Sequence, residues 1–165
     1  MIKSFEALSL KAYHGKADRA GVWTIGWGHT KGVRPGDVVT RERAEELFNA
    51  DLEPVEKTLN ADLVTGRPRP LVTQDQFDAL CSFVFNEGSG HYLDSTLRRK
   101  IKQGDIMGAA GEFERWIYAD HKIAPGLINR RAAEQKLFLQ GGAVDIAALL
   151  LGVMLAGSVL LVAML

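Results

Sequence analysis

The chain has 165 residues, enough for one domain with a substantial core or for two small lobes that share one. Charged residues make up 24% of it, and Lys plus Arg equal Asp plus Glu at 20 each, so the composition excludes a disordered polymer and the net charge gives no support to nucleic-acid binding. The single cysteine, Cys81, excludes an internal disulfide and a multi-cysteine zinc site, and its apolar neighbours predict a buried structural thiol.

The first part of the chain changes from a strand pattern to a helical pattern at Thr40. Residues 20–40 are rich in glycine and β-branched residues, which predicts a small twisted sheet. From Thr40 a capping threonine precedes strong helix formers, and the apolar residues up to Leu59 have helical spacing. Pro54 predicts a kink or a division of this helix, because proline has no backbone N–H. Residues 65–70, TGRPRP, predict a loop between two lobes.

The next part of the chain predicts a series of helices. Thr73 and Gln76 have the spacing of a capping box at the start of an apolar helix that ends near Gly88. A short helix is expected over residues 94–102, and Asp105 is placed to cap the helix that follows it.

The last part of the polar region predicts one more helix. Phe113, Trp116 and Tyr118 have helical spacing and are expected to pack in the core. Residues 126–142 predict a helix that Gly141 and Gly142 stop. The expected fold class is therefore α+β, with a small N-terminal β-sheet lobe and a helical C-terminal lobe.

The end of the chain is strongly apolar. Residues 146–165 contain no charged side chain, and a helix of that length spans a hydrocarbon core of roughly 30 Å. We therefore expect a polar domain over residues 1–142 and a transmembrane helix over residues 143–165. A buried core helix and a segment that disturbs an outer membrane are the alternatives.

Basic residues precede the apolar segment and none follows it. Arg130, Arg131 and Lys136 lie within about 20 residues of the segment, so the positive-inside rule predicts that the polar domain starts in the cytoplasm. Arg130 and Arg131 are otherwise interpreted as a solvated helix face, with attraction to anionic cell-wall polymers as the alternative. A series of small residues could allow a weak helix–helix dimer: Ala148, Gly152 and Ala156.

Glu6 and Asp18 are the candidate acid and base. Glu6 has apolar neighbours, which favour a general acid because burial penalises the charged form of a carboxyl group. Asp18 lies in the polar turn GKADRAG and is expected to be ionised. Two carboxyl groups in contrasting surroundings suit glycoside hydrolysis, in which one protonates the leaving oxygen and the other activates water. The Thr24 hydroxyl could help to hold that water. Two ordinary surface charges are the alternative interpretation.

Four blocks of sequence, in the same order, resemble the phage lysozyme family of T4-type muramidase endolysins. SFEALSLKAY resembles the family's opening around its catalytic glutamate, and GVWTIGWGHT its sheet motif. TQDQFDALCSFVFNEGSG followed by STLRRKIKQGD resembles the central helices, and FERWIYADHKIAPGLINRRAAEQKLFL the closing segment.

The resemblance implies a lysozyme-like catalytic domain over residues 1–142 that needs no metal and no cofactor. The implied reaction is hydrolysis of the β-1,4 bond between N-acetylmuramic acid and N-acetylglucosamine in peptidoglycan, which lyses the host cell. Glu6 would donate the proton, while Asp18 and Thr24 would position the attacking water and give inversion. With an anchor in the host inner membrane, the enzyme would start in the cytoplasm and act on the periplasmic wall, similar to the signal-anchor endolysins, whose membrane segment is N-terminal.

The chain departs from the family in one spacing. Eleven residues separate Glu6 from Asp18, where the family has eight, while five separate Asp18 from Thr24 as in the family. Keeping the first spacing would put Gly15 and Gly21 in the two positions, and glycine has no side chain for either role. The longer loop leaves open a catalytically inactive, membrane-anchored wall-binding protein. A holin-like pore former that uses the apolar segment is a third possibility.

Aromatic residues and histidines surround the candidate site in the sequence. Tyr13, Trp23 and Trp27 either stack on sugar rings or pack the sheet against a helix. His29 is expected to be a hydrogen-bonded structural residue, and His14 a solvated loop residue. The histidines have no metal-binding spacing.

Overall fold

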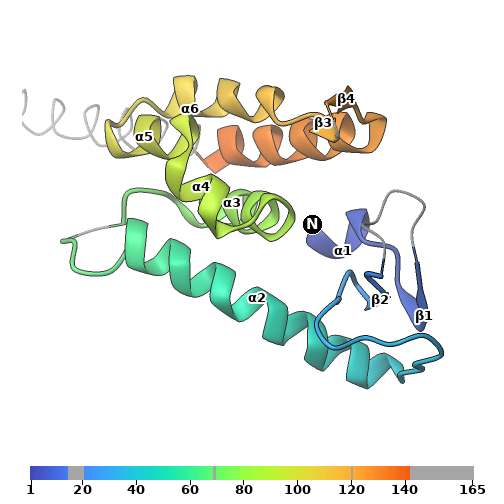
Figure 1. Cartoon of the computed structure of the whole chain (residues 1–165). Coiled ribbons are helices and arrows are strands. Elements are labelled where there is room, and N and C mark those ends of the chain that lie inside the picture. Colours follow the sequence, from blue (N-terminus) through green and yellow to red (C-terminus); the bar gives the residue numbers. More distant parts are fainter. Residues whose placement is uncertain (15–20, 69, 120, 142–165) are drawn as a thin grey trace, which may run out of the picture.

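The computed structural model describes residues 1–14, 21–68, 70–119 and 121–141, and Figure 1 shows their arrangement in two lobes. The sheet lobe contains α1 (Ile2–Phe5), β1 (Ser9–Tyr13) and β2 (Thr24–Gly26). β1 and β2 pair antiparallel, and the register shifts between the Ser9–Gly26 and Tyr13–Thr24 pairs. The small sheet predicted from residues 20–40 is therefore confirmed for β2, but its partner β1 lies before residue 20, outside the predicted range.

α2 (Arg41–Leu63) runs from the sheet lobe to the helical lobe (Figure 1). The Thr40 hydroxyl caps its start by accepting a hydrogen bond of 3.1 Å from the Arg43 N–H. Of the two outcomes predicted at Pro54, a kink or a division, the division is wrong, because α2 continues through this residue as one helix. Ala50, whose carbonyl loses its helical donor at Pro54, is exposed, so water can replace that donor.

The helical lobe packs around α3 (Gln74–Glu87). Thr73 and Gln76 form the predicted capping box at its start. α3 packs against α2 on one side and lies beneath the layer of later helices on the other (Figure 1). The remaining elements follow in order: α4 (Ser89–Asp94), α5 (Thr96–Lys102), α6 (Ile106–Glu112), the 3₁₀ turn η1 (Phe113–Arg115), β3 (Tyr118–Ala119), β4 (Lys122–Ile123) and a helix over residues 125–141.

The core of the helical lobe is built on Phe83 of α3. Its ring makes edge contacts with the rings of Phe113 and Trp116, at centroid distances of 5.5 and 5.2 Å. The predicted packing of Phe113 and Trp116 is thus confirmed, but Tyr118 is 58% exposed and the prediction for it is wrong. The chain leaves the helical conformation at Trp116 and enters the β3–β4 hairpin, which turns Tyr118 outward.

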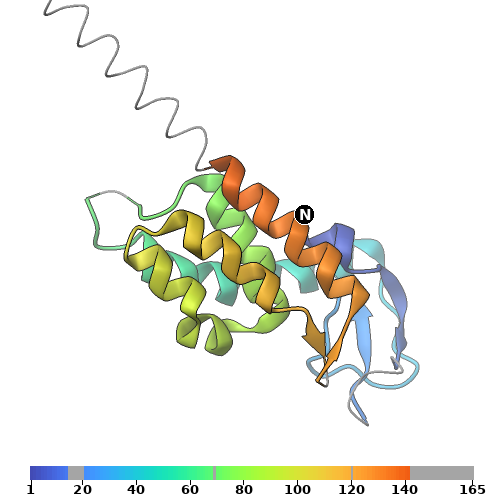
Figure 2. The same ribbon diagram turned by 90° about the horizontal axis from the view of Figure 1, so that it is seen from above.

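Figure 2 shows the helix over residues 125–141 running from the hairpin past α1 and back along the helical lobe. Gly141, a predicted stop, is still helical, and Gly142 lies outside the described residues. Within the described part of the chain, no helix combines the length and apolar character that crossing a bilayer requires. The transmembrane helix predicted over residues 143–165, with Ala148, Gly152 and Ala156, lies outside that part.

Candidate active site

Glu6 lies where α1 gives way to extended chain. Its backbone has φ −96° and ψ 117°, and its N–H donates to the Ile2 carbonyl at 3.2 Å, which closes the single turn of α1. The side chain is 23% exposed. The carboxyl group is therefore held by short local structure and remains accessible.

Arg130 is the charged partner of Glu6. Its Nη1 donates to Glu6 Oε1 at 2.6 Å, and its guanidinium group lies 5.4 Å from the centre of the Phe5 ring. The Arg130 side chain is only 5% exposed, so solvent screens this ion pair weakly. The expectation of an apolar setting for Glu6 is wrong, because a residue 124 positions away supplies a buried positive charge.

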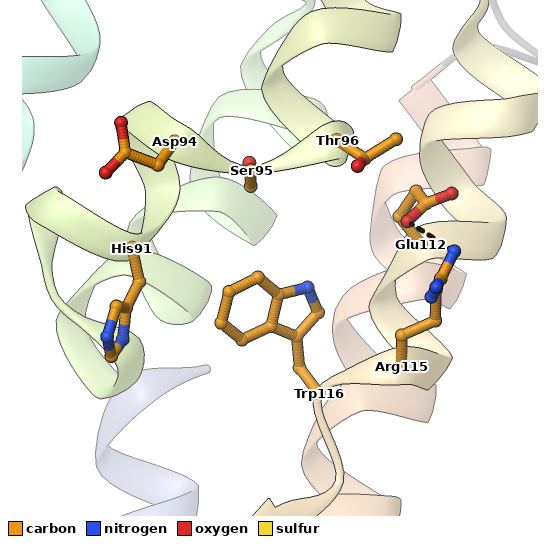
Figure 3. Close-up of a pocket in the computed structure, with 7 residues that line it drawn as sticks. All are labelled: His91, Asp94, Ser95, Thr96, Glu112, Arg115 and Trp116. Carbon is orange, nitrogen blue, oxygen red and sulfur yellow. Dashed lines mark ion pairs between the residues drawn. The ribbon is translucent and has the colours of Figure 1, made fainter.

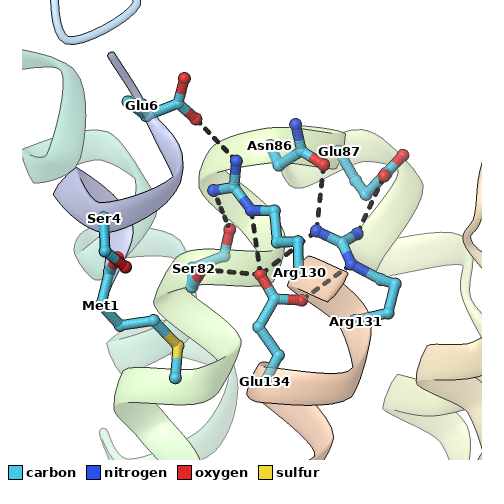
Figure 4. Close-up of polar contacts among 9 residues, drawn as sticks. All are labelled: Met1, Ser4, Glu6, Ser82, Asn86, Glu87, Arg130, Arg131 and Glu134. Carbon is cyan, nitrogen blue, oxygen red and sulfur yellow. Dashed lines mark hydrogen bonds and ion pairs between the residues drawn. The ribbon is translucent and has the colours of Figure 1, made fainter. Parts of the chain in front are cut away.

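A network of ion pairs extends from Arg130 into the helical lobe (Figure 4). Glu134 Oε1 accepts hydrogen bonds from Arg130 Nε at 3.1 Å, from Ser82 Oγ at 2.6 Å and from Arg131 Nη2 at 3.2 Å. Arg131 also donates to Glu87 Oε1 at 2.9 Å. Burial lowers the pKa of Arg131 and raises that of Glu134, as expected for charged groups removed from water.

Gly28 brings backbone close to the other oxygen of Glu6. A Cβ atom built at Gly28 would lie 3.4 Å from Glu6 Oε2, and Gly28 has φ +90°, which side-chain-bearing residues rarely adopt. Gly28 follows β2, which begins at Thr24. Thr24 is 6% exposed and pairs with Tyr13 in the sheet. The sheet motif therefore places a bare backbone, and so free space, beside Glu6 Oε2.

Asp18, the predicted second carboxylate, lies outside the described residues. The described neighbours of the Glu6 carboxyl group are Arg130, at Oε1, and Gly28, beside Oε2. Among the described residues, no cluster of three or more His, Cys, Asp or Glu side chains could hold a metal ion.

The turn GWGHT, residues 26–30, is fixed to α2 by its own side chains. His29 Nδ1 lies 2.8 Å from Asp51 Oδ2, and Nε2 lies 2.9 Å from the Lys31 carbonyl, so the prediction of a hydrogen-bonded structural histidine is confirmed. Trp27 is 6% exposed and makes an edge contact with Phe48 of α2, which decides its role in favour of packing. The exposed His14 lies against Trp23 at a centroid distance of 6.0 Å.

A pocket of about 410 Å³ lies in the helical lobe (Figure 3). The Trp116 indole lies at its centre, between the α4–α5 junction and the end of α6. Its described lining residues are His91, Asp94, Ser95, Thr96, Glu112, Arg115 and Trp116. Neither Glu6 nor Thr24 belongs to this lining, so the pocket adds no group to the candidate catalytic site.

Sequence reasoning missed the role of the two arginines. Arg130 and Arg131 are 4% and 0% exposed, so their interpretation as a solvated helix face is wrong. A signal was present, because Glu134 follows them by four and three residues and therefore lies on the same helix face. Phe138, one turn later, is fully buried, which marks that face as the inner one.

Comparisons with known proteins found similar sequences and structures. The phage lysozyme family model matches residues 3–134. An endolysin of Acyrthosiphon pisum secondary endosymbiont phage 1 is 44% identical over 142 residues, which cover 84% of this chain and 92% of that protein. A SAR-endolysin of Bacteriophage PS119 is 39% identical over 130 residues, which cover 78% of this chain and 75% of that protein.

A solved structure, the muramidase domain of SpmX from Asticaccaulis excentricus, superimposes with a TM-score of 0.72 at 37% identity. The match covers 84% of this chain and 91% of that domain. The two-lobed α+β architecture is thus lysozyme-like, and the chain belongs to the phage lysozyme family.

Proposed function

We propose that the chain is an endolysin that hydrolyses the β-1,4 bond between N-acetylmuramic acid and N-acetylglucosamine. Membership of the phage lysozyme family makes it a glycoside hydrolase of bacterial peptidoglycan. One observation carries the assignment of Glu6 as the acid: its two carboxyl oxygens lie in different surroundings. Arg130 holds Oε1 at 2.6 Å, while Oε2 faces the space that Gly28 leaves open.

These surroundings suit a proton donor. The proton would leave from Oε2, the oxygen that lies beside the backbone of Gly28, while Oε1 is held by Arg130. As the carboxyl group becomes negative, the nearby Arg130 guanidinium stabilises the charge in a setting with little solvent screening. Asp18 and Thr24 would position the attacking water on the other side of the sugar, as the family pattern implies.

The test compares the full chain with its Glu6→Gln variant in a turbidity assay on chloroform-treated bacteria. Glutamine keeps the volume and an acceptor for Arg130 but cannot donate the acid proton, so the rate should fall about 10²–10⁴-fold. Glu46→Gln, which changes an exposed residue of α2, is the control and should retain full activity. Full activity of Glu6→Gln would end the assignment.

Residues 143–165 are proposed to anchor the domain formed by residues 1–142 in the host inner membrane, with that domain first in the cytoplasm. The charge-free stretch of 20 residues supports this proposal, as does the similarity to a SAR-endolysin. Of the three basic residues used for the orientation, Lys136 alone is exposed, because Arg130 and Arg131 are buried in the ion network. The enzyme would then need membrane disruption or release to reach the wall.

Fractionation tests the anchor. The full chain should sediment with membranes and a chain truncated after residue 142 should not, whereas recovery of the full chain in the soluble fraction without detergent would discard the anchor. We propose that a weak dimer within the membrane depends on three small residues, Ala148, Gly152 and Ala156. Replacing them by larger residues should reduce the amount of dimer captured by chemical cross-linking.

A second candidate is a catalytically inactive protein that binds the wall on a lysozyme scaffold. The eleven-residue separation of Glu6 and Asp18 is the feature that favours it. An inactive wild-type chain that still sediments with purified peptidoglycan would support this candidate over the enzyme.

A further inference from the structure

Glu134 is a fully buried carboxyl group that the proposed catalytic mechanism does not use. It is 0% exposed and lies one helical turn after Arg130. Its two oxygens face donors alone among the described side chains: Ser82 Oγ from α3, and the guanidinium groups of Arg130 and Arg131 from its own helix. Burying a carboxyl group is costly unless it is paired, so this arrangement calls for a reason.

The contacts of Arg130 supply that reason. Its guanidinium group is held at all three nitrogens: Nη1 donates to Glu6 Oε1, Nη2 donates to the Ser82 carbonyl at 3.0 Å, and Nε donates to Glu134 Oε1. A planar group fixed at Nη2 and Nε has one orientation left for Nη1. Glu134 and the α3 backbone therefore determine where Arg130 meets Glu6 (Figure 4).

The charges of the network lead to the same conclusion. Two guanidinium groups, Arg130 and Arg131, face three carboxyl groups, Glu6, Glu87 and Glu134. Glu134 Oε1 accepts hydrogen bonds from both Arg130 Nε and Arg131 Nη2, whereas Glu87 pairs with Arg131. The carboxyl group of Glu134 is therefore the one that shares its charge with the guanidinium group that contacts Glu6.

We propose that Glu134 is a positioning residue for the general acid: it orients Arg130 and balances its charge, and so holds the Glu6 carboxyl group in place when substrate binds. This inference rests on the proposed function of Glu6. Glu134 acts through Arg130 and does not touch the sugar.

The test uses the full chain with Glu134→Gln, which keeps the volume but removes the charge. We expect kcat to fall about 10–100-fold, because the acid is misoriented, while KM stays within about twofold. With Glu134 neutral, the Arg130 charge acts on Glu6 without compensation, so the alkaline limb of the pH–rate profile should move to lower pH. An unchanged limb with an unchanged kcat would overturn the proposal.

Glu87→Gln is the matched control. Glu87 pairs with Arg131 and has no contact with Arg130 among the described residues, so its loss removes the same charge from the network without releasing Arg130. We expect kcat within about twofold of the wild type and an unmoved alkaline limb. An equal effect of both variants would reduce Glu134 to a structural role and overturn the proposal.

A readout without substrate separates this inference from the proposed function. The Nε–H of Arg130, hydrogen-bonded and buried in the wild type, should give a protected NMR signal that exchanges much faster in Glu134→Gln. If the wild type does not cleave peptidoglycan, the proposed function fails while this signal still tests the coupling. If Glu134→Gln does not fold, Ser82→Ala replaces it as the test variant. This change removes one hydrogen-bond donor to Glu134 and keeps a helix-forming residue in α3, and it should shift the alkaline limb in the same direction.

Discussion

Replacing Asp62 by Asn tests how the far end of α2 is fastened to the helical lobe. Asp62 accepts hydrogen bonds from Arg98 Nε at 2.9 Å and Nη2 at 2.8 Å, and from the Tyr92 hydroxyl at 3.1 Å. Lys102 Nζ lies 2.5 Å from Oδ1. One carboxyl group thus joins α2 to α4 and α5. Asparagine keeps the shape but loses the charge that attracts both cations.

The expected loss follows from the exposure of the partners. Asp62 is 8% exposed, which would give each charged hydrogen bond up to about 1.5–3 kcal/mol. Arg98 and Lys102 are 26% and 32% exposed, so solvent reduces their contributions toward the roughly 0.2–1 kcal/mol of surface pairs. With about 1 kcal/mol for the Tyr92 bond, the free energy of unfolding should fall by about 2 kcal/mol. For a chain of this size, the melting temperature should fall by roughly 4–8 °C.

The pH dependence gives the sharper signature. Burial acts to raise the pKa of Asp62, but the hydrogen bonds from Arg98, Lys102 and Tyr92 outweigh it and hold the pKa at about 2, below the ordinary value of 3.8. A carboxyl group with a lowered pKa stabilises the folded state fully above its unfolded-state pKa. The difference between wild type and variant should therefore be complete at pH 6, shrink below pH 3.8 and vanish as the pH falls through about 2.

Urea unfolding, followed by far-UV circular dichroism between pH 2 and pH 7, measures this difference. Glu46→Gln in the same helix is the control, because Glu46 is 64% exposed and pairs with the 58% exposed Arg43, so its loss should cost less than about 0.5 kcal/mol. A loss for Asp62→Asn below about 0.5 kcal/mol at pH 6, or one that does not change with pH, would refute the reasoning.

Three further changes test other parts of the structure. Gly28→Ala should lower stability by about 1 kcal/mol because of its positive φ, and should reduce turbidity clearance because the new methyl group touches Glu6 Oε2; unchanged clearance would contradict the open space assigned to the acid. Cys81 should resist a thiol reagent at pH 8 and react in urea, because burial raises its pKa to about 12, and rapid labelling of the folded chain would contradict its buried position. Thr73→Ala should cost about 1 kcal/mol by removing the capping box with Gln76, as measured by urea unfolding, and an unchanged midpoint would deny the cap a role.

The sequence by itself determined the elements whose signals lie a few residues apart. The capping box at Thr73, the cap at Asp105 and the strand pattern before Thr40 each depend on backbone groups within one turn, and the structure confirms them. Predictions from local sequence patterns failed at two places, Pro54 and Tyr118. Pro54 is accommodated because the carbonyl that it leaves without a donor can reach water, and Tyr118 lies beyond a helix end that periodicity did not locate.

Only the tertiary structure decided the surroundings of Glu6. Arg130 reaches Glu6 across 124 positions, and Arg98 reaches Asp62 across 36. Periodicity indicates that a helix has an inner face, yet it does not say which distant group that face meets. A buried charge is stable only beside its partner, so the fold that brings the two lobes together also creates the electrostatic setting of the acid.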